Sequence, residues 1–190
     1  MNQLEIILKH KQTEIEKRRI ELPLDRLIKM PLFDQKVKSL SAALKSGSGV
    51  IAEYKRTSPS AGKIQDRKIE EVVSFYQKNQ VSAYSVLTDH EFFKGTIEDL
   101  KKVKETTNGV VLRKEFIIDE YQLFEAKAFG ADAVLLIAEA LDEYHARHLA
   151  TIAHTVGLEV LMEFHSEREL DKLSEAVDVV GINNRNLKTL

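Results

Sequence analysis

The chain has 190 residues and no cysteine, and its 28 basic and 30 acidic residues give a formal net charge of −2. This length suits one well-buried domain, while the charge balance and the lack of cysteine exclude the basic footprint of nucleic-acid-binding domains, disulfides and a thiol nucleophile. Because no apolar run reaches the ~20 residues that span a bilayer, and the N-terminus lacks the pattern of a signal peptide, we predict a cytoplasmic protein with no membrane partner and no nucleic-acid partner.

The first 49 residues are predicted to form a helical extension. Residues 2–19 place apolar side chains at helical spacing, and Pro23 interrupts this pattern. A second helix is predicted over residues 32–44, ahead of a Ser/Gly-rich turn. We therefore expect one domain overall, made of this extension (1–49) and a barrel-like part (50–190).

From residue 50 the sequence alternates between short apolar runs and amphipathic segments of helical period. This alternation predicts repeated strand–helix units and hence a parallel sheet. Several helices begin with a capping residue, such as Thr96 before IEDL and Asp119 before EYQL. The predicted strands are 50–55, 82–88, 109–114, 133–138, 159–164 and 178–183, and the helices between them are 68–79, 96–106, 119–129, 142–156 and 166–176.

The number of units is informative about the fold. A complete eight-stranded barrel needs ~200 residues or more, so the part from residue 50 onward is about two units short. The sequence therefore predicts an α/β fold that is either an open six-stranded sheet or an incomplete (β/α)8 barrel of the TIM type.

Charged and amide side chains stand at the C-terminal ends of the predicted strands. An ion inside a buried strand costs several kcal/mol unless it is paired or faces a polar pocket. Because the C-terminal ends of parallel strands meet at one rim, we expect these side chains to share a site. They are Glu53 and Lys55 in VIAEYKRTSPSAG, Lys114 in VVLRKEF, Glu163 in VLMEF, and Asn183 and Arg185 in VVGINNRN.

The rim combines lysines with glutamates, and such neighbours shift each other's pKa values, which general acid–base catalysis exploits. The loop SPSAG adds hydroxyl and N–H groups that suit an anion, and Phe92, Phe93 and Phe116 add flat apolar surface. The sequence therefore predicts a pocket for a ligand with an anionic end and a flat apolar end.

The same segments resemble a known family. The motifs IAEYKRTSPSAG, SVLTDHEFFKGT, VVLRKEFIIDEYQ, GADAVLLIAEAL, GLEVLMEFHSE and VVGINNRNLKTL, in this order, resemble indole-3-glycerol-phosphate synthase of tryptophan biosynthesis over about residues 1–190. The resemblance implies a (β/α)8 barrel that closes the ring of 1-(2-carboxyphenylamino)-1-deoxyribulose 5-phosphate with loss of CO2 and water. It implies no metal and no organic cofactor, and it implies that the N-terminal extension lies over the open end of the barrel.

The resemblance also implies roles for individual residues. Lys114 would be the general acid that protonates the ribulose carbonyl oxygen, and Glu163 would remove a proton in the later steps. Lys55 would assist acid catalysis and contact the phosphate, while Glu53 would orient lysine and substrate. The implied substrate-binding residues are Ser58, Pro59, Leu87, Phe93, Phe116, Leu135, Ile137, Asn183 and Arg185.

One departure from the family affects the expected activity. The family's phosphate cradle comes mainly from turns after strands 7 and 8, which lie beyond the six strands predicted here. We therefore expect the 190 residues alone to have little or no synthase activity. We also expect the open edges of the first and sixth strands to favour self-association.

Several alternatives stay open. Glu53 and Lys55 could form a structural ion pair, and a lysine in such a pocket could form a Schiff base. His145 and His148 could suggest a metal, although two histidines on one helix without a third ligand are usually a solvated face. His165, just past Glu163, could modulate a pKa but could equally be a loop residue. For the whole chain, the alternatives are another phosphate-binding barrel enzyme and a non-catalytic, oligomerising partial barrel.

Overall fold

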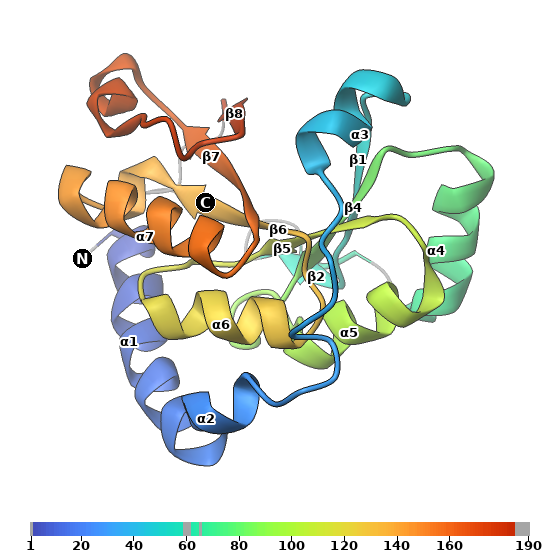
Figure 1. Cartoon of the computed structure of the whole chain (residues 1–190), viewed down its shortest axis with the longest axis horizontal. Coiled ribbons are helices and arrows are strands. Elements are labelled where there is room, and N and C mark those ends of the chain that lie inside the picture. The colour runs from blue at the N-terminus through green and yellow to red at the C-terminus, as the bar shows by residue number, and fades with distance from the viewer. Residues whose placement is uncertain (1, 59–61, 65, 185–190) are drawn as a thin grey trace.

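Six parallel strands form one curled sheet in the computed structural model, which describes residues 2–58, 62–64 and 66–184. The strands lie side by side in chain order, so each pairs with the strand before it (Figure 1). This half-barrel confirms the prediction of an incomplete (β/α)8 barrel. The strands are β1 (Ile51–Tyr54), β4 (Ala83–Leu87), β5 (Val110–Lys114), β6 (Ala133–Ile137), β7 (Glu159–Phe164) and β8 (Val179–Ile182).

Helices connect these strands and pack around the sheet (Figure 1). As predicted, Thr96 and Asp119 cap their helices, each in a capping box whose side chain accepts a backbone N–H of the first turn. Among the described residues, no helix is both long enough and apolar enough to cross a membrane. The helices are α4 (Ile69–Lys78), α5 (Ile97–Thr106), α6 (Glu120–Ala128) and α7 (Glu143–Thr155), with short 3-10 helices η1 (Ala138–Ala140) and η2 (Glu167–Lys172).

The helix predicted over residues 166–176 is wrong in type and length, because only η2 forms there. Its backbone bonds span three residues, as in Glu169 N to Ser166 O at 3.2 Å. The Glu169 carboxylate also accepts from the backbone N–H of His165 and the hydroxyl of Ser166. These local bonds hold a tight turn in place of a full helix.

The N-terminal part contains α1 (Gln3–Glu21), α2 (Leu24–Leu27) and α3 (Leu40–Ser46). The first helix was predicted, but the helix predicted over 32–44 is wrong in its first two turns. There the backbone N–H of Lys38 donates to Asp132 Oδ1 at 2.9 Å, and Ser39 caps α3. A contact with a residue 94 positions away thus replaces the helical hydrogen bonds.

A short antiparallel pair was not predicted at all. It consists of β2 (Thr57–Ser58) and β3 (Gly62–Lys63), and it follows directly after β1. The sequence suggested only that the first strand breaks at this point, because Pro59 and its serine neighbours are typical of loops.

The sheet separates two apolar clusters, one on each face. The outer cluster joins the strands to α4–α7, and the inner cluster contains Leu112, Leu135 and Leu161 of β5, β6 and β7. Leu4 and Ile7 of α1 belong to this inner cluster. The first turns of the N-terminal helix therefore pack on the concave side of the sheet, whereas Ile15 further along α1 belongs to the outer cluster.

Candidate active site

A cavity of about 260 Å³ lies at the C-terminal ends of the strands, on the concave side of the sheet. Most of the residues proposed from the sequence line it, together with one that was not proposed, Glu115. A larger hollow of about 510 Å³ lies between α1 and the starts of α6 and α7, away from these side chains. The cavity is lined by Glu53, Lys55, Leu87, Phe93, Lys114, Glu115, Phe116, Leu135, Ile137, Glu163 and Asn183.

The register of the strands explains this convergence. Leu87 of β4 lies opposite Lys114 of β5, and Ile137 of β6 lies opposite Glu163 of β7. Since side chains alternate between the two faces of a strand, Lys114 and Leu112 lie on the same inner face. Lys114 is the one nearer the C-terminal end of β5. Apolar side chains thus fill the barrel interior, and the charged ones follow where the strands end.

Lys114 and Glu163 form the centre of the cavity. Lys114 Nζ lies 3.6 Å from Glu163 Oε2, and the Asn183 amide donates to Glu163 Oε1 at 2.9 Å. The Glu163 side chain is only 11% exposed, whereas that of Lys114 is 26% exposed. A group that can donate a proton and a group that can accept one therefore stand side by side and face the same space.

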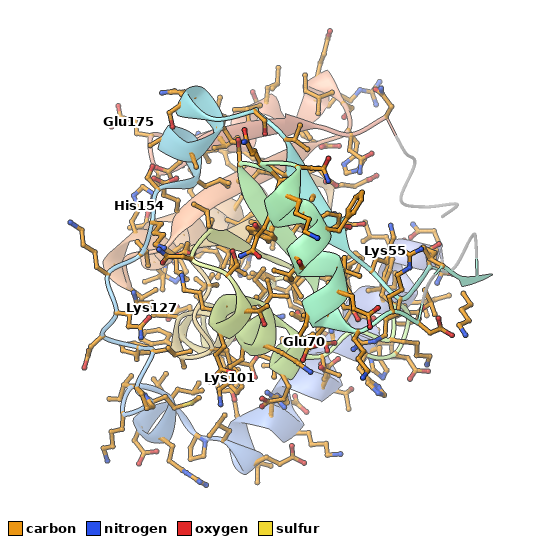
Figure 2. The ribbon with its side chains drawn as sticks, turned by 90° about the vertical axis from the view of Figure 1, so that its right-hand side faces the viewer. Lys55, Glu70, Lys101, Lys127, His154 and Glu175 are labelled. Atoms are coloured by element: carbon orange, nitrogen blue, oxygen red, sulfur yellow. The ribbon has the colours of Figure 1, made fainter. Side chains whose placement is uncertain are left out.

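A second ion pair stands on the first strand. Lys55 Nζ lies 2.7 Å from Glu53 Oε1, and both side chains are partly exposed. Figure 2 shows Lys55 on the opposite side of the molecule from Lys127 and His154. The geometry fits both a structural pair and a pair that contacts a ligand.

Aromatic and aliphatic side chains form the wall of the cavity. The rings of Phe93 and Phe116 are tilted against each other with centroids 6.2 Å apart. Leu87, Leu135 and Ile137 are buried beside them. This combination of a flat apolar wall and a charged rim suits a ligand that is aromatic at one end and polar at the other.

Behind the wall lies a buried charge cluster that the sequence analysis missed. Lys11 Nζ of α1 lies 2.8 Å from Glu14, 2.9 Å from Asp89 and 3.1 Å from Glu115. Burial alone would raise the pKa of Glu115, but the positive charges of Lys11 and Arg113 outweigh this effect and lower that pKa. The signal was present in the sequence, because Lys11 falls on the same helical stripe as the apolar residues of α1.

This cluster fixes parts of the cavity. Asp89 Oδ1 accepts the backbone N–H groups of Phe92 and Phe93 at 2.8 and 3.2 Å, and Glu115 directly follows Lys114. The N-terminal helix therefore holds the two loops that carry the aromatic wall and the central lysine.

One residue proposed from the sequence does not line the cavity, and two others cannot be placed relative to it. Ser58 is buried in β2, outside the cavity lining. Pro59 and Arg185 lie outside the described residues, as does most of the SPSAG loop.

The comparisons with known proteins agree with this geometry. The sequence pattern described as "Indole-3-glycerol phosphate synthase" matches residues 4–190. Curated proteins of that name are 50% identical over 154 residues in Bacteroides thetaiotaomicron, covering 80% of this chain, and 40% identical over 188 residues in Thermoanaerobacter pseudethanolicus, covering 98% of it. The chain spans 59% of the length of the first and 72% of the second. On the family match and these identities, the chain belongs to the indole-3-glycerol phosphate synthase family.

Proposed function

We propose that the cavity at the strand ends is the site where 1-(2-carboxyphenylamino)-1-deoxyribulose 5-phosphate is cyclised to indole-3-glycerol phosphate. The observation that carries this proposal is the Lys114–Glu163 pair, 3.6 Å apart, in a cavity with an aromatic wall. Membership of the family supports the same reaction, as well as a cytoplasmic location, a small phosphorylated partner and no cofactor.

The roles in this reaction follow from the chemistry. As the ring carbon that bears the carboxylate attacks the ribulose carbonyl, the oxygen gains a proton from Lys114 and the carboxylate leaves as CO2. Loss of CO2 restores the benzene ring. The new hydroxyl group then takes up a proton from Lys55 and leaves as water, while Glu163 accepts a proton from the CH2 group beside the nitrogen, which completes the pyrrole ring.

The remaining lining residues position the substrate in this proposal. Phe93, Phe116 and the aliphatic wall hold the anthranilate ring, and Asn183 donates to Glu163 or to a substrate hydroxyl. Lys55, oriented by Glu53, contacts the phosphate and assists the general acid. Such positioning accounts for a large part of the rate in reactions that depend on a remote anchor.

The test is the steady-state turnover of Lys114→Ala and Glu163→Gln variants, followed by the fluorescence of the indole product. Because the chain spans 59% of the length of the Bacteroides relative, each variant is made in the chain and in a fusion to the remaining C-terminal part of that relative. We expect each substitution to lower kcat by about 100-fold or more, the usual contribution of general acid–base catalysis.

The control is Lys101→Ala, which removes a partly exposed lysine of α5 that does not line the cavity. Its kcat should stay within about twofold of the parent, as for most exposed sites. Retained turnover in both Lys114→Ala and Glu163→Gln would contradict the proposal.

A further inference from the structure

A buried histidine lies directly beside the Glu163 carboxylate but does not line the cavity. The His165 side chain is 8% exposed, and its Nε2 lies 3.4 Å from Glu163 Oε1. Its other ring nitrogen, Nδ1, lies 4.0 Å from Glu169 Oε2. The imidazole therefore lies between two carboxylates, one near each ring nitrogen.

The turn after β7 fixes the two carboxylates on either side of this ring. Glu169 Oε2 accepts the backbone N–H of His165 at 2.9 Å, and Glu169 Oε1 accepts the Ser166 hydroxyl at 3.0 Å. The Glu163 carboxylate is held as well, because the Asn183 amide donates to its Oε1 at 2.9 Å. Since both carboxylates are anchored, the contacts of the imidazole depend mainly on whether it carries one proton or two.

The charged groups that face the ring come from several elements and are mostly acidic. Glu139 of η1 brings a third carboxylate oxygen within 4.8 Å. Of the nearby lysines, Lys114 lies 3.6 Å from the other oxygen of Glu163, and Lys172 Nζ donates to the carbonyl of Ala138 at 2.7 Å. An imidazolium has two N–H donors, one for each anchored carboxylate, whereas a neutral imidazole has one donor and turns a lone pair toward the other carboxylate.

We propose that His165 is a positioning residue whose protonated ring bridges Glu163 to Glu169 and thereby slows proton acceptance by Glu163. This role rests on the proposed cyclisation, in which Glu163 accepts a proton from the substrate. A carboxylate that already accepts an N–H from a cation is a weaker proton acceptor. Histidines ordinarily lose a proton at about pH 6.5, and its loss removes the bridge while Asn183 and Lys114 stay beside Glu163. His165 thus makes turnover sensitive to acidification.

The bridge is tested in the 190-residue chain, independently of turnover, by a double-mutant cycle of His165→Gln and Glu163→Gln in urea denaturation. At pH 5.5 the two substitutions should be non-additive by about tenfold in the unfolding equilibrium constant, as for a hydrogen bond to a charged group. At pH 8, where histidines are ordinarily neutral, they should be additive within about twofold. Glu163→Gln alone should also destabilise the chain more at pH 5.5 than at pH 8, which keeps the test decisive even if His165→Gln does not fold.

The matched control is an exposed pair of the same chemistry. His148 Nε2 lies 2.5 Å from Glu120 Oε1, and the two side chains are 36% and 48% exposed. Exposed ion pairs contribute little, so the cycle of His148→Gln and Glu120→Gln should show a smaller coupling at pH 5.5. The bridge is overturned if the coupling of His165 with Glu163 is no larger than this control, or if it is equally large at pH 8.

The effect on the rate is tested with the fusion to the C-terminal part of the Bacteroides relative, by measuring kcat and KM between pH 5.5 and pH 8. Acidification should lower kcat about tenfold more in the parent than in His165→Gln, because the variant has no ring to protonate, while KM stays within about twofold. Parallel pH profiles of the two proteins, with Glu163→Gln inactive, overturn the role of His165 alone. Full turnover of Glu163→Gln overturns the proposed role of Glu163 and this role with it.

Discussion

At the scale of single residues, Lys11 shows how one buried charge joins the N-terminal helix to the C-terminal ends of the strands. Burial alone would lower the pKa of Lys11, but the carboxylates of Glu115, Asp89 and Glu14 outweigh it and raise that pKa. Removing one partner from a buried ion cluster leaves the others without compensation, and this is more damaging than the net value of the pair.

Lys11→Met should therefore lower the free energy of unfolding at pH 7 by about 3–5 kcal/mol, measured by urea denaturation. The Glu115 pKa is lowered in the folded state, so its contribution exists above the unfolded value of 4.5 and is lost as the pH falls through the folded pKa. The difference between parent and variant should accordingly be smaller at pH 4 than at pH 7.

The matched control is Lys17→Met on the same helix, where the lysine side chain is 77% exposed and lies 3.7 Å from Glu21. Exposed pairs of this kind contribute about 0–1 kcal/mol. Equal losses in the two variants, or a difference that does not depend on pH, would show that the buried cluster has no special role.

The polar residues at the strand ends were predictable because an ion in an apolar strand is conspicuous, and five of the six proposed on that ground line the cavity. The five apolar residues of the wall were implied as substrate-binding by the family resemblance. Lys11 and Glu115 were not predicted. Lys11 falls on the apolar stripe of α1, but a lysine on a mostly charged helix is usually solvated, and it is the tertiary contacts that leave its side chain 1% exposed.

At the scale of elements, the helix starts are set by local side-chain chemistry. Thr96 Oγ1 accepts the backbone N–H of Asp99 at 3.2 Å, and the Asp99 carboxylate accepts the N–H of Thr96 at 2.9 Å. Thr96→Ala removes this cap of α5 and should lower the free energy of unfolding by about 1 kcal/mol, measured by thermal or urea denaturation.

Thr106→Ala in the last turn of the same helix is the control. Its hydroxyl donates to the carbonyl of Lys102 at 2.7 Å, a bond that contributes little to a helix, and alanine has the higher helix propensity. This variant should therefore be neutral or slightly more stable. A loss as large as that of Thr96→Ala would mean that the cap has no specific effect.

The strands and the helices α4–α7 could be predicted because the spacing of apolar residues, the length of each segment and the capping residues all indicate the same type of element. The true start of the helix predicted over 32–44 could not be found from the sequence, because it depends on Asp132, far along the chain, which accepts the backbone N–H of Lys38. The helix predicted over residues 166–176 could not be ruled out from the sequence either, because there the backbone of His165 and the hydroxyl of Ser166 both donate to the Glu169 side chain. Long-range or side-chain bonds decide the structure where the apolar pattern is weak.

At the scale of the whole molecule, β1 and β8 stand at the two ends of the strand order in the described sheet. On β8, Val180 is 51% and Ile182 is 83% exposed. Exposed apolar edge strands favour pairing with another chain. We therefore predict that the 190-residue chain self-associates in a concentration-dependent manner.

Ile182→Lys should shift the weight-average mass toward the monomer in light scattering, because a charge on an edge strand opposes pairing. Ile20→Lys is the control, since Ile20 of α1 is equally exposed at 83% but lies away from the sheet edge. An equal shift in both variants, or a monomeric parent at every concentration, would argue against association through the edge.

The most direct test of the proposed site is a crystal structure of the chain with indole-3-glycerol phosphate bound. We predict that the indole ring lies against Phe93 and Phe116, and that Lys114 and Glu163 both contact the same product molecule. A product bound outside this cavity, or one that only one of these two side chains can reach, would contradict the account.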